Sequence, residues 1–356
     1  MPLKQLAFAC AAAAALLAAS PSQAQPAKPA LRVVLIDVEG GASTLYVTPE
    51  GKSLLVDAGW PEGQRAGVGG DSADRVVAAL RKAGLNKLDV LVVSHYHSDH
   101  SGAVPKLLRT IPVGLVVDHG ENFETIPRGD GYISPRLIRE YLDAAREAGV
   151  KRKIVKAGER MRIGSMRVDF VNAHKFVTPR PLAKTPAPAG CDEMAERPPI
   201  QEDENDYAIG VVATYGKARV LNLADTTWFI EKRLLCPVNR IGPIDLMVVS
   251  HHGAAASNSP QLYDATRPRV ALVGNGATKG GDKRVFETLA AAPSSPDVWQ
   301  LHSATRSPEI DAPADRIANL ADAPDMAHPL EALLYRDGAI RVENGRNGFA
   351  RDYAAP

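Results

Sequence analysis

The chain has 356 residues, enough to bury one large hydrophobic core or two modest ones. Its 42 Lys and Arg residues nearly balance its 41 Asp and Glu residues, so the formal net charge is +1. This balance excludes a strong overall field for nucleic acid or an anionic membrane, although a local basic patch is compatible with it.

The N-terminal segment has the pattern of a secretory signal peptide. Lys4 supplies a positive charge, residues 6–19 are apolar, and residues 22–24 (SQA) are typical of a cleavage site. We therefore predict a signal peptide over 1–24, a Pro/Ala linker over 25–30 and a periplasmic or extracellular product. An uncleaved membrane anchor is the alternative, but the apolar stretch is short for one, and no other segment approaches a transmembrane length.

Two cysteines remain after that cleavage, Cys191 and Cys236. An oxidising compartment permits a disulfide between them. Neither lies in a CxxC or Cys/His cluster of the kind that binds metal. Because the sequence does not fix their distance, their pairing is left open.

The first half alternates short apolar runs with helical patterns. Runs bounded by Gly, Pro or Asp indicate strands, and apolar periodicity between a cap residue and a glycine indicates a helix. The expected strands are 31–38, 43–48, 53–57, 88–94 and 113–118, and the expected helices are 71–83, 99–109 and 135–148.

The second half uses the same patterns and adds one long irregular segment. The expected strands are 162–171 (a hairpin about Gly164-Ser165), 207–215, 218–223, 245–250, 269–274, 298–302, 330–335 and 339–343, and the expected helices are 228–235, 260–265 and 284–291. Residues 178–204 lack periodicity and are long for a connection, which indicates a functional loop or a disordered insertion. We expect this segment to cover the cleft of the site described next.

Two segments of the second half repeat segments of the first. Residues 52–57 (KSLLVD) resemble 218–225 (ARVLNLAD), and residues 88–95 (LDVLVVSH) resemble 244–251 (IDLMVVSH). Each half thus has an apolar strand ending in Asp, a helix, and an apolar strand ending in Ser-His. If the halves pack sheet to sheet, one edge carries two carboxylates and a group of histidines.

A dense set of metal-ligand side chains follows the strand at 88–94. His95 and His97 are one residue apart, so in extended backbone both side chains point the same way. Asp99 and His100 follow where the chain turns into a helix. Imidazole and carboxylate are ligands of Zn²⁺ and similar ions. A surface cluster of no consequence is the alternative, but the buried strand that leads into the run favours a metal site.

The second half supplies candidates at equivalent positions. Asp225 ends the matching strand and is the natural candidate to bridge two ions, although it also has the position of a helix N-cap. His251 is favoured as a ligand because it is equivalent to His95. His252 is then a group that supports a ligand or faces the substrate, or a merely structural histidine.

These motifs resemble the metallo-β-lactamase superfamily, an α+β fold built as an αββα sandwich of two pseudo-symmetric halves. The resemblance extends to its ComEC-type branch, named for the soluble hydrolase domain of bacterial DNA-uptake channels, through residues 35–38 (LIDV), 55–59 (LVDAG), 95–100 (HYHSDH), 205–207 (NDY) and 250–253 (SHHG). It covers residues 31–345, with the insertion at 178–204, and leaves 346–356 as a C-terminal tail.

The resemblance implies a ligand set. His95 and His97 bind the first metal, Asp225 bridges, and Asp57 supports the site from beneath. Asp99, His100 and His251 bind the second metal.

The remaining first-site ligand is less defined by the resemblance. His174 is the candidate by chain order, with an ordinary loop histidine as the alternative, and His119 is next. ComEC-type members depart from the usual pattern here, so an incomplete first site is a further alternative. The usual Gly before the bridging Asp is Ala224 in this chain.

Two adjacent ions, expected to be Zn²⁺ with Mn²⁺ as the alternative, lower the pKa of a bridging water and polarise the scissile bond. Asp99 orients that water or accepts its proton. Neither a G-x-S-x-G motif nor a phosphate-binding glycine loop competes with this interpretation. Polar residues after second-half strands could reach the substrate pocket or be ordinary loop residues: Asn258, Asn275, Lys279, His302 and Arg306.

The leading hypothesis is a secreted metallo-hydrolase of phosphodiester or other ester-like bonds. The alternatives are a lactone or β-lactam hydrolase and a non-catalytic binding module of the same fold. The expected partner is a small-molecule or nucleotide-like substrate, with nucleic acid implied by the family resemblance alone.

Overall fold

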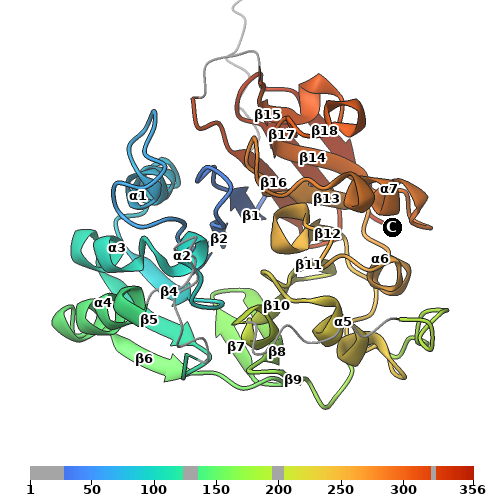
Figure 1. The fold of residues 1–356 in the computed structure, drawn as a ribbon, viewed down its shortest axis with the longest axis horizontal. Coiled ribbons are helices and arrows are strands. Elements are labelled where there is room, and N and C mark those ends of the chain that lie inside the picture. Colours follow the sequence, from blue (N-terminus) through green and yellow to red (C-terminus); the bar gives the residue numbers. More distant parts are fainter. Residues whose placement is uncertain (1–27, 123–134, 195–203, 322–325) are drawn as a thin grey trace, which may run out of the picture.

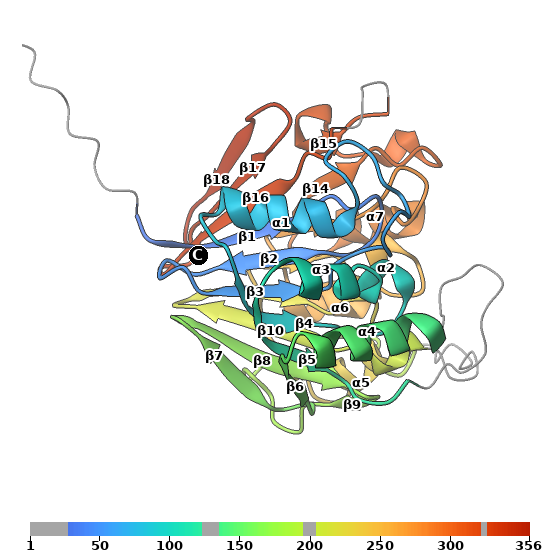
Figure 2. The ribbon, with the colours of Figure 1, turned by 90° about the vertical axis from the view of Figure 1, so that its left-hand side faces the viewer.

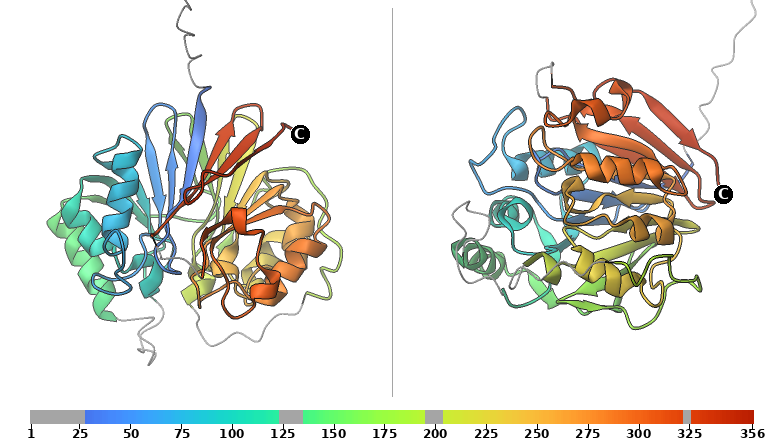
Figure 3. Two further views of the ribbon diagram at one scale, coloured as in Figure 1. Left: turned by 90° about the horizontal axis from the view of Figure 1, so that it is seen from above. Right: turned by 45° about the vertical axis from the view of Figure 1, so that its right-hand side comes forward.

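The structure is a computed structural model that describes residues 28–122, 135–194, 204–321 and 326–356. Within these ranges the chain forms two nine-stranded sheets that pack face to face, with helices on both outer faces (Figure 1, Figure 2). The left view of Figure 3 shows the four layers edge-on. The expected αββα sandwich of the α+β class is confirmed. The predicted signal peptide lies outside the described residues.

The first sheet has the order β18-β17-β16-β1-β2-β3-β4-β5-β6. Its strands are β1 (Ala30–Leu35), β2 (Thr44–Val47), β3 (Ser53–Val56), β4 (Leu88–Val92), β5 (Val113–Asp118), β6 (Lys151–Ile154), β16 (Leu330–Tyr335), β17 (Ile340–Asn344) and β18 (Ala350–Tyr353). The last three strands return from the end of the chain, and β16 pairs antiparallel with β1. Because β18 pairs with β17, the sheet extends past the expected domain boundary at 345 into the segment expected to be a tail.

The second sheet has the order β15-β14-β13-β12-β11-β10-β8-β7, and β9 pairs with β8. Its strands are β7 (Arg160–Ile163), β8 (Met166–Ala173), β9 (Phe176–Val177), β10 (Gly210–Tyr215), β11 (Ala218–Asn222), β12 (Leu246–Val248), β13 (Val270–Val273), β14 (Asp297–His302) and β15 (Ile317–Asn319).

Helices follow the strands on the outer faces. They are α1 (Ser72–Lys82), α2 (Ser98–Ser101), α3 (Val104–Thr110), α4 (Pro135–Glu147), α5 (Trp228–Leu235), α6 (Pro260–Thr266) and α7 (Lys283–Ala291), with the 3₁₀ turns η1 (Glu204–Tyr207), η2 (Ser250–Gly253), η3 (Pro308–Ile310) and η4 (Ala314–Arg316). Asp71 caps α1 through its carboxylate, which accepts from the backbone N–H groups of Ala73 and Asp74. No helix among the described residues is long and apolar enough to cross a membrane.

Apolar side chains of both sheets meet in the central core. Val33 of β1 and Leu54 of β3 contribute from the first sheet, and Phe170 of β8 and Trp299 of β14 contribute from the second. One further cluster lies between each sheet and its own helices. Strands that are buried on both faces explain why their sequences are continuous apolar runs.

The repeated segments do form matching units. In the first sheet β2 and β3 are antiparallel and β3 is parallel to β4. In the second sheet β10 and β11 are antiparallel and β11 is parallel to β12. The carboxyl ends of β3, β4, β11 and β12 therefore face one edge of the sandwich, as the sequence predicts.

Cys191 and Cys236 form a disulfide with a Cα–Cα distance of 5.8 Å. It joins the expected insertion to the end of α5. The described part of the insertion also packs near α6, since Gln261 Nε2 donates to the Gly190 carbonyl oxygen and the Leu182 N–H donates to that of Arg240. These contacts place residues 178–194 against the outer helices, and they do not support the expected cover over the site. Residues 195–203 lie outside the described part.

Candidate metal centre

The run from His95 to His100 forms one wall of the candidate site. β4 ends at Val92, and the extended backbone after it directs His95 and His97 to the same side, with 2.9 Å between His95 Nε2 and His97 Nδ1. Helix α2 then begins after His97 and carries Asp99 and His100. All four side chains are buried. The spacing of the motif thus produces the expected convergence.

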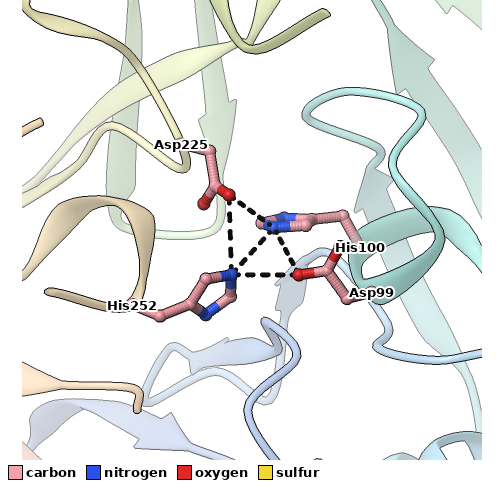
Figure 4. A group of neighbouring side chains, drawn as sticks. All are labelled: Asp99, His100, Asp225 and His252. Atoms are coloured by element: carbon pink, nitrogen blue, oxygen red, sulfur yellow. Dashed lines mark hydrogen bonds and ion pairs between the residues drawn. The ribbon is translucent and has the colours of Figure 1, made fainter. Parts of the chain in front are cut away.

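The described residues form three groups of potential metal ligands, and two of these contain residues of this run. The first consists of His95, His97 and Asp225, and the second of Asp99, His100, Asp225 and His252. Within each group, one ligand atom from every residue lies within 4.8 Å of the others. Figure 4 shows the second group: its side chains converge from both halves, with Asp225 Oδ2 3.2 Å from His100 Nε2. Because Asp225 belongs to both groups, it lies where a bridging ligand is expected.

The histidine that the second half of the chain contributes to the second group is His252, not the predicted His251. His252 Nε2 lies 3.0 Å from Asp99 Oδ2 and 3.5 Å from Asp225 Oδ2. His251 Nε2 is 3.4 Å from Asp225 Oδ2, but its Nδ1 is paired with the Ser257 hydroxyl and its side chain is 20% exposed. The physical reason is the backbone: φ is 52° at His251 and 54° at His252, so the chain turns in the left-handed region. The equivalence with His95 does not carry over to side-chain direction.

Asp57 contacts His100 from beneath the candidate site. Its Oδ2 is 2.8 Å from His100 Nδ1, which leaves Nε2 directed at the second group. The same carboxylate accepts from the N–H and the hydroxyl of Ser94. The Ser94 hydroxyl is also 3.0 Å from His95 Nδ1. This chain of contacts fixes the orientation of two histidines.

The buried charges are coupled. Burial alone raises the pKa of Asp225, but His100, His251 and His252 outweigh it and hold that pKa well below its usual range. Burial alone lowers the pKa of His100, but Asp225, Asp99 and Asp57 raise it well above its usual value.

The pKa of His95 is lowered well below its usual value by burial, with the neighbouring His100 and His97 acting in the same direction. Burial alone raises the pKa of Asp99, whereas Lys279 and His100 bring it well below its usual range. The groups therefore combine ionised carboxylates with neutral and charged imidazoles. A divalent cation binds such donors by displacing their protons.

Lys279 is a site residue that sequence reasoning left among ordinary loop residues. Its Nζ forms an ion pair with Asp99 Oδ2 and donates to the Gly40 carbonyl oxygen over 2.9 Å. The adjacent Gly41 is required by close approach, since a Cβ there would lie 2.7 Å from the Asp99 carbonyl oxygen. No sequence motif identifies this lysine, because it follows β13 in a loop and meets Asp99 only in the fold.

Of the other loop candidates, none belongs to the two groups that share Asp225, but His302 forms a third group of potential ligands with Asp37 and Glu39. Asn258 donates to the Ser250 and Ala254 carbonyl oxygens and so braces the loop that carries His252. His302 Nε2 lies 2.8 Å from Asp37 Oδ1, and Asn275 donates to the His302 carbonyl oxygen. Arg306 is exposed.

The remaining ligand expected for the first site, beyond His95, His97 and Asp225, is not found among the described residues. His174 lies at the turn between β8 and β9, with its ring facing Phe176 and Tyr207. His119 is fully buried, and its Nε2 is 2.7 Å from Glu204 Oε1. Neither histidine belongs to a group with His95 and His97.

The donor set fits a divalent cation. Nitrogen and carboxylate oxygen atoms suit Zn²⁺, and Mn²⁺ accepts the same types with more oxygen. The four-residue group has enough protein ligands for a closed or nearly closed site. The three-residue group has the number found where a fourth position stays open for water or substrate.

Comparisons with known proteins agree with this geometry. The family model of the metallo-beta-lactamase superfamily matches residues 36–273. Recombination protein 2 of Haemophilus influenzae is 24% identical over 255 residues, covering 71% of this chain and 25% of that protein. ComE operon protein 3 of Bacillus subtilis is 24% identical over 257 residues, covering 68% of this chain and 28% of that protein. The chain thus spans about a quarter of the length of these relatives.

A third relative matches a shorter part of the chain. Hydroxyacylglutathione hydrolase of Aliivibrio salmonicida is 32% identical over 87 residues, which cover 24% of this chain and 34% of that protein. The similarity to ComE operon protein 3 agrees with the ComEC-type motifs, and the family match spans both ligand groups from His95 to His252. The chain belongs to the metallo-beta-lactamase superfamily.

Proposed function

We propose that this chain is a secreted metal-dependent hydrolase that acts on phosphodiester or other ester-like bonds. The observation that supports the proposal is the pair of buried donor groups that share Asp225. His95, His97 and Asp225 would hold one ion, and Asp99, His100, Asp225 and His252 the other, with zinc the first candidate and manganese the second. The chemistry supplied by bound metal is Lewis acidity, which acidifies water and polarises the scissile oxygen.

The chain's own residues orient the reaction. Asp57 fixes the His100 ring through Nδ1, so that Nε2 stays directed at the second group. Asp99 presents an ionised carboxylate at the same point and can orient a water or take up its proton. Lys279 adds a positive charge beside Asp99, where an anionic substrate would be attracted.

The phosphodiester preference is supported by the similarity to ComE operon protein 3 and by the ComEC-type motifs. The purified protein, loaded with Zn²⁺ or Mn²⁺, is tested on bis-p-nitrophenyl phosphate, single-stranded DNA and nitrocefin. We expect hydrolysis of a phosphodiester, and turnover of nitrocefin alone would reject that preference in favour of β-lactams.

Metal analysis separates the enzyme from a non-catalytic module. We expect one to two ions per chain after gentle purification, and Asp225→Asn to lower that number. His328→Ala is the matched control, because the recorded hydrogen bonds of His328 are made by its backbone. Less than one ion per chain, with no hydrolysis after metal addition, favours the binding module.

Secretion is supported by the N-terminal pattern and by the Cys191–Cys236 disulfide, since disulfides persist in oxidising compartments. N-terminal sequencing of the exported protein should begin at Gln25. A product that retains residues 1–24 and stays with the membrane fraction would instead identify an anchor.

A further inference from the structure

A cavity of about 620 Å³ lies between the β5–β6 edge of the first sheet and the β8–β9 hairpin of the second. Its lining includes His119, Ile154, Lys156, His174, Phe176 and Pro179. The metal groups use neither His119 nor His174. Two histidines predicted as possible ligands therefore line a separate space, for which the proposed chemistry has given no role.

One lining residue of the cavity, His119, contacts the run from His95 to His100 through Tyr96. The His119 ring packs against the Tyr96 ring with 4.4 Å between centroids, and Tyr96 lies between His95 and His97. His119 Nε2 and the Tyr96 N–H both contact Glu204 Oε1, at 2.7 and 3.2 Å. His119, which lines the cavity, and Tyr96, which contacts it, thus link this space to the segment that carries the first metal group.

Aromatic rings line the side of the cavity that faces the second sheet. The rings of His174 and Phe176 are parallel to within 2°, with 6.2 Å between centroids. Tyr207 meets His174 edge-on at 5.5 Å. Phe176 is 63% exposed, which makes it the most exposed of the large hydrophobic side chains in the described part of the chain. An exposed ring beside a parallel one is a platform on which a planar ligand stacks.

The turn that carries His174 has positive φ angles at residues that are uncommon in such turns. His174 and Lys175 are the two residues between β8 and β9, with φ of 54° and 65°. Hairpin turns with positive φ at both central positions usually contain Asn or Gly. Keeping His and Lys here costs conformational energy, a pattern that is concentrated at functional sites.

Much of the cavity wall comes from a stretch of the sequence that is rich in Lys and Arg. Residues 151–184 contain ten Lys and Arg residues and two acidic ones, a formal net charge of +8 in a chain of net charge +1. Some of these cations are paired, as Arg152 is with Asp118 and Lys153 with Glu159. Lys156 and Glu121 both line the cavity, so its wall carries charges of both signs, and the cation excess is a property of the wider segment.

We propose that this cavity binds the planar aromatic ring of a phosphate-bearing substrate, with the ring against Phe176 and His174 and the phosphoester toward the metal groups. The direction of the phosphoester rests on the proposed function, whereas ring binding does not. The same chemistry occurs in a free nucleotide, an aryl phosphate and a base of single-stranded nucleic acid.

Calorimetric titration of the metal-loaded protein with adenosine 5′-monophosphate and with ribose 5-phosphate tests ring binding without catalysis. We expect the nucleotide to bind roughly 5- to 150-fold more tightly, the range that one stacked base contributes. Phe176→Ala should remove the difference and Phe176→Tyr should keep it. Val68→Ala is the matched control, an exposed apolar side chain at 51% exposure that does not line this cavity.

Equal affinities, no detectable nucleotide binding, or a ratio unchanged in Phe176→Ala would overturn the proposal. Ring-selective binding without hydrolysis of any phosphoester would reject the proposed function and leave this inference standing. Hydrolysis without ring preference would do the reverse. Parallel titrations with phenyl phosphate and an eight-residue oligothymidylate identify which source of the ring binds best.

Discussion

The segments after β4 and β12 both direct histidines into the candidate site, but they do so with different backbone conformations. After β4 the backbone stays extended, so alternate side chains, His95 and His97, face the site together. After β12 the backbone enters the left-handed region at His251 and His252, and the second histidine faces the site. Equivalent Ser-His sequences thus place different side chains, because direction depends on the local backbone conformation.

The supports differ as well. In the first half a charged side chain, Asp57, holds His100 directly. In the second half His252 Nδ1 is 3.2 Å from the Gly274 carbonyl oxygen, and the loop is braced by Asn258 and Glu231. The first half orients its ligands through a carboxylate, and the second through backbone and loop contacts.

Asp225→Asn removes the carboxylate that belongs to both ligand groups, and it should have the largest effect on activity. We expect kcat/KM on the best substrate to fall by at least about 100-fold, since even supporting residues of metal ligands are typically worth 10- to 100-fold. Zinc content measured by mass spectrometry should fall with it. Full metal occupancy in the variant would show that Asp225 does not bridge.

His252→Ala and His251→Ala compare the two neighbours directly. His252→Ala should lose one ion per chain and about 100-fold in activity, whereas His251→Ala should keep both ions and lose less than about 10-fold. Zinc titration of both variants provides the measurement. The reverse order would restore the prediction made from the sequence repeat.

Asp57→Asn tests the carboxylate support of the first half. Asparagine fits the backbone, where φ is 61°, but cannot hold a charged His100. We expect a loss of roughly 10- to 100-fold in activity, with weaker zinc binding. Asp89→Asn is the matched control, because Asp89 accepts hydrogen bonds from Ser53, away from the ligand groups. Equal effects would indicate a general loss of stability.

Glu231, which contacts the loop after His252, should make the free energy of unfolding depend on pH. Burial raises its pKa to about 7 from the usual 4.5, while its carboxylate accepts from the N–H groups of Asn258 and Ser259. The unfolded chain releases this proton at lower pH than the folded chain, so the stability from the protonated form is present below pH 4.5 and lost as pH rises to 7. The difference is at most about 3 kcal/mol.

Urea unfolding at pH 4.5 and 7.5 measures this loss in the free energy of unfolding. Glu231→Gln should reduce it, and the exposed control Glu147→Gln should not. An unchanged pH dependence in Glu231→Gln would assign the effect to other groups.

The sequence predicts most of the first ligand wall, because His95, His97, Asp99 and His100 are placed by spacing along one strand and one helix. It also places Asp225 through the repeated strand pattern. The choice between His251 and His252 depends on two positive φ angles that adjacent residues do not reveal. Lys279 meets Asp99 across 180 residues, and no local pattern encodes that contact.

The fold is predicted where apolar runs are long. β6 (KRKI) and β18 (ARDY) were missed because their sequences show no apolar alternation, and their pairing partners alone define them as strands. β1 ends at Leu35 rather than continuing to 38, and the expected helix after Asp99 divides into α2 and α3. The prediction of His174 as the remaining first-site ligand depended on chain order alone, which does not reveal the conformation of the turn that carries this residue.

Because β1 pairs with β16, the first sheet is completed only after the second half of the chain has been synthesised. Leu35 lies opposite Leu330, so the first sheet acquires its inner neighbour only after nearly the whole chain has been synthesised. Until then one edge of β1 offers unpaired backbone groups to any other strand. The sheet that carries the first ligands to be made is therefore the last to be completed, because it needs the C-terminal strands β16, β17 and β18.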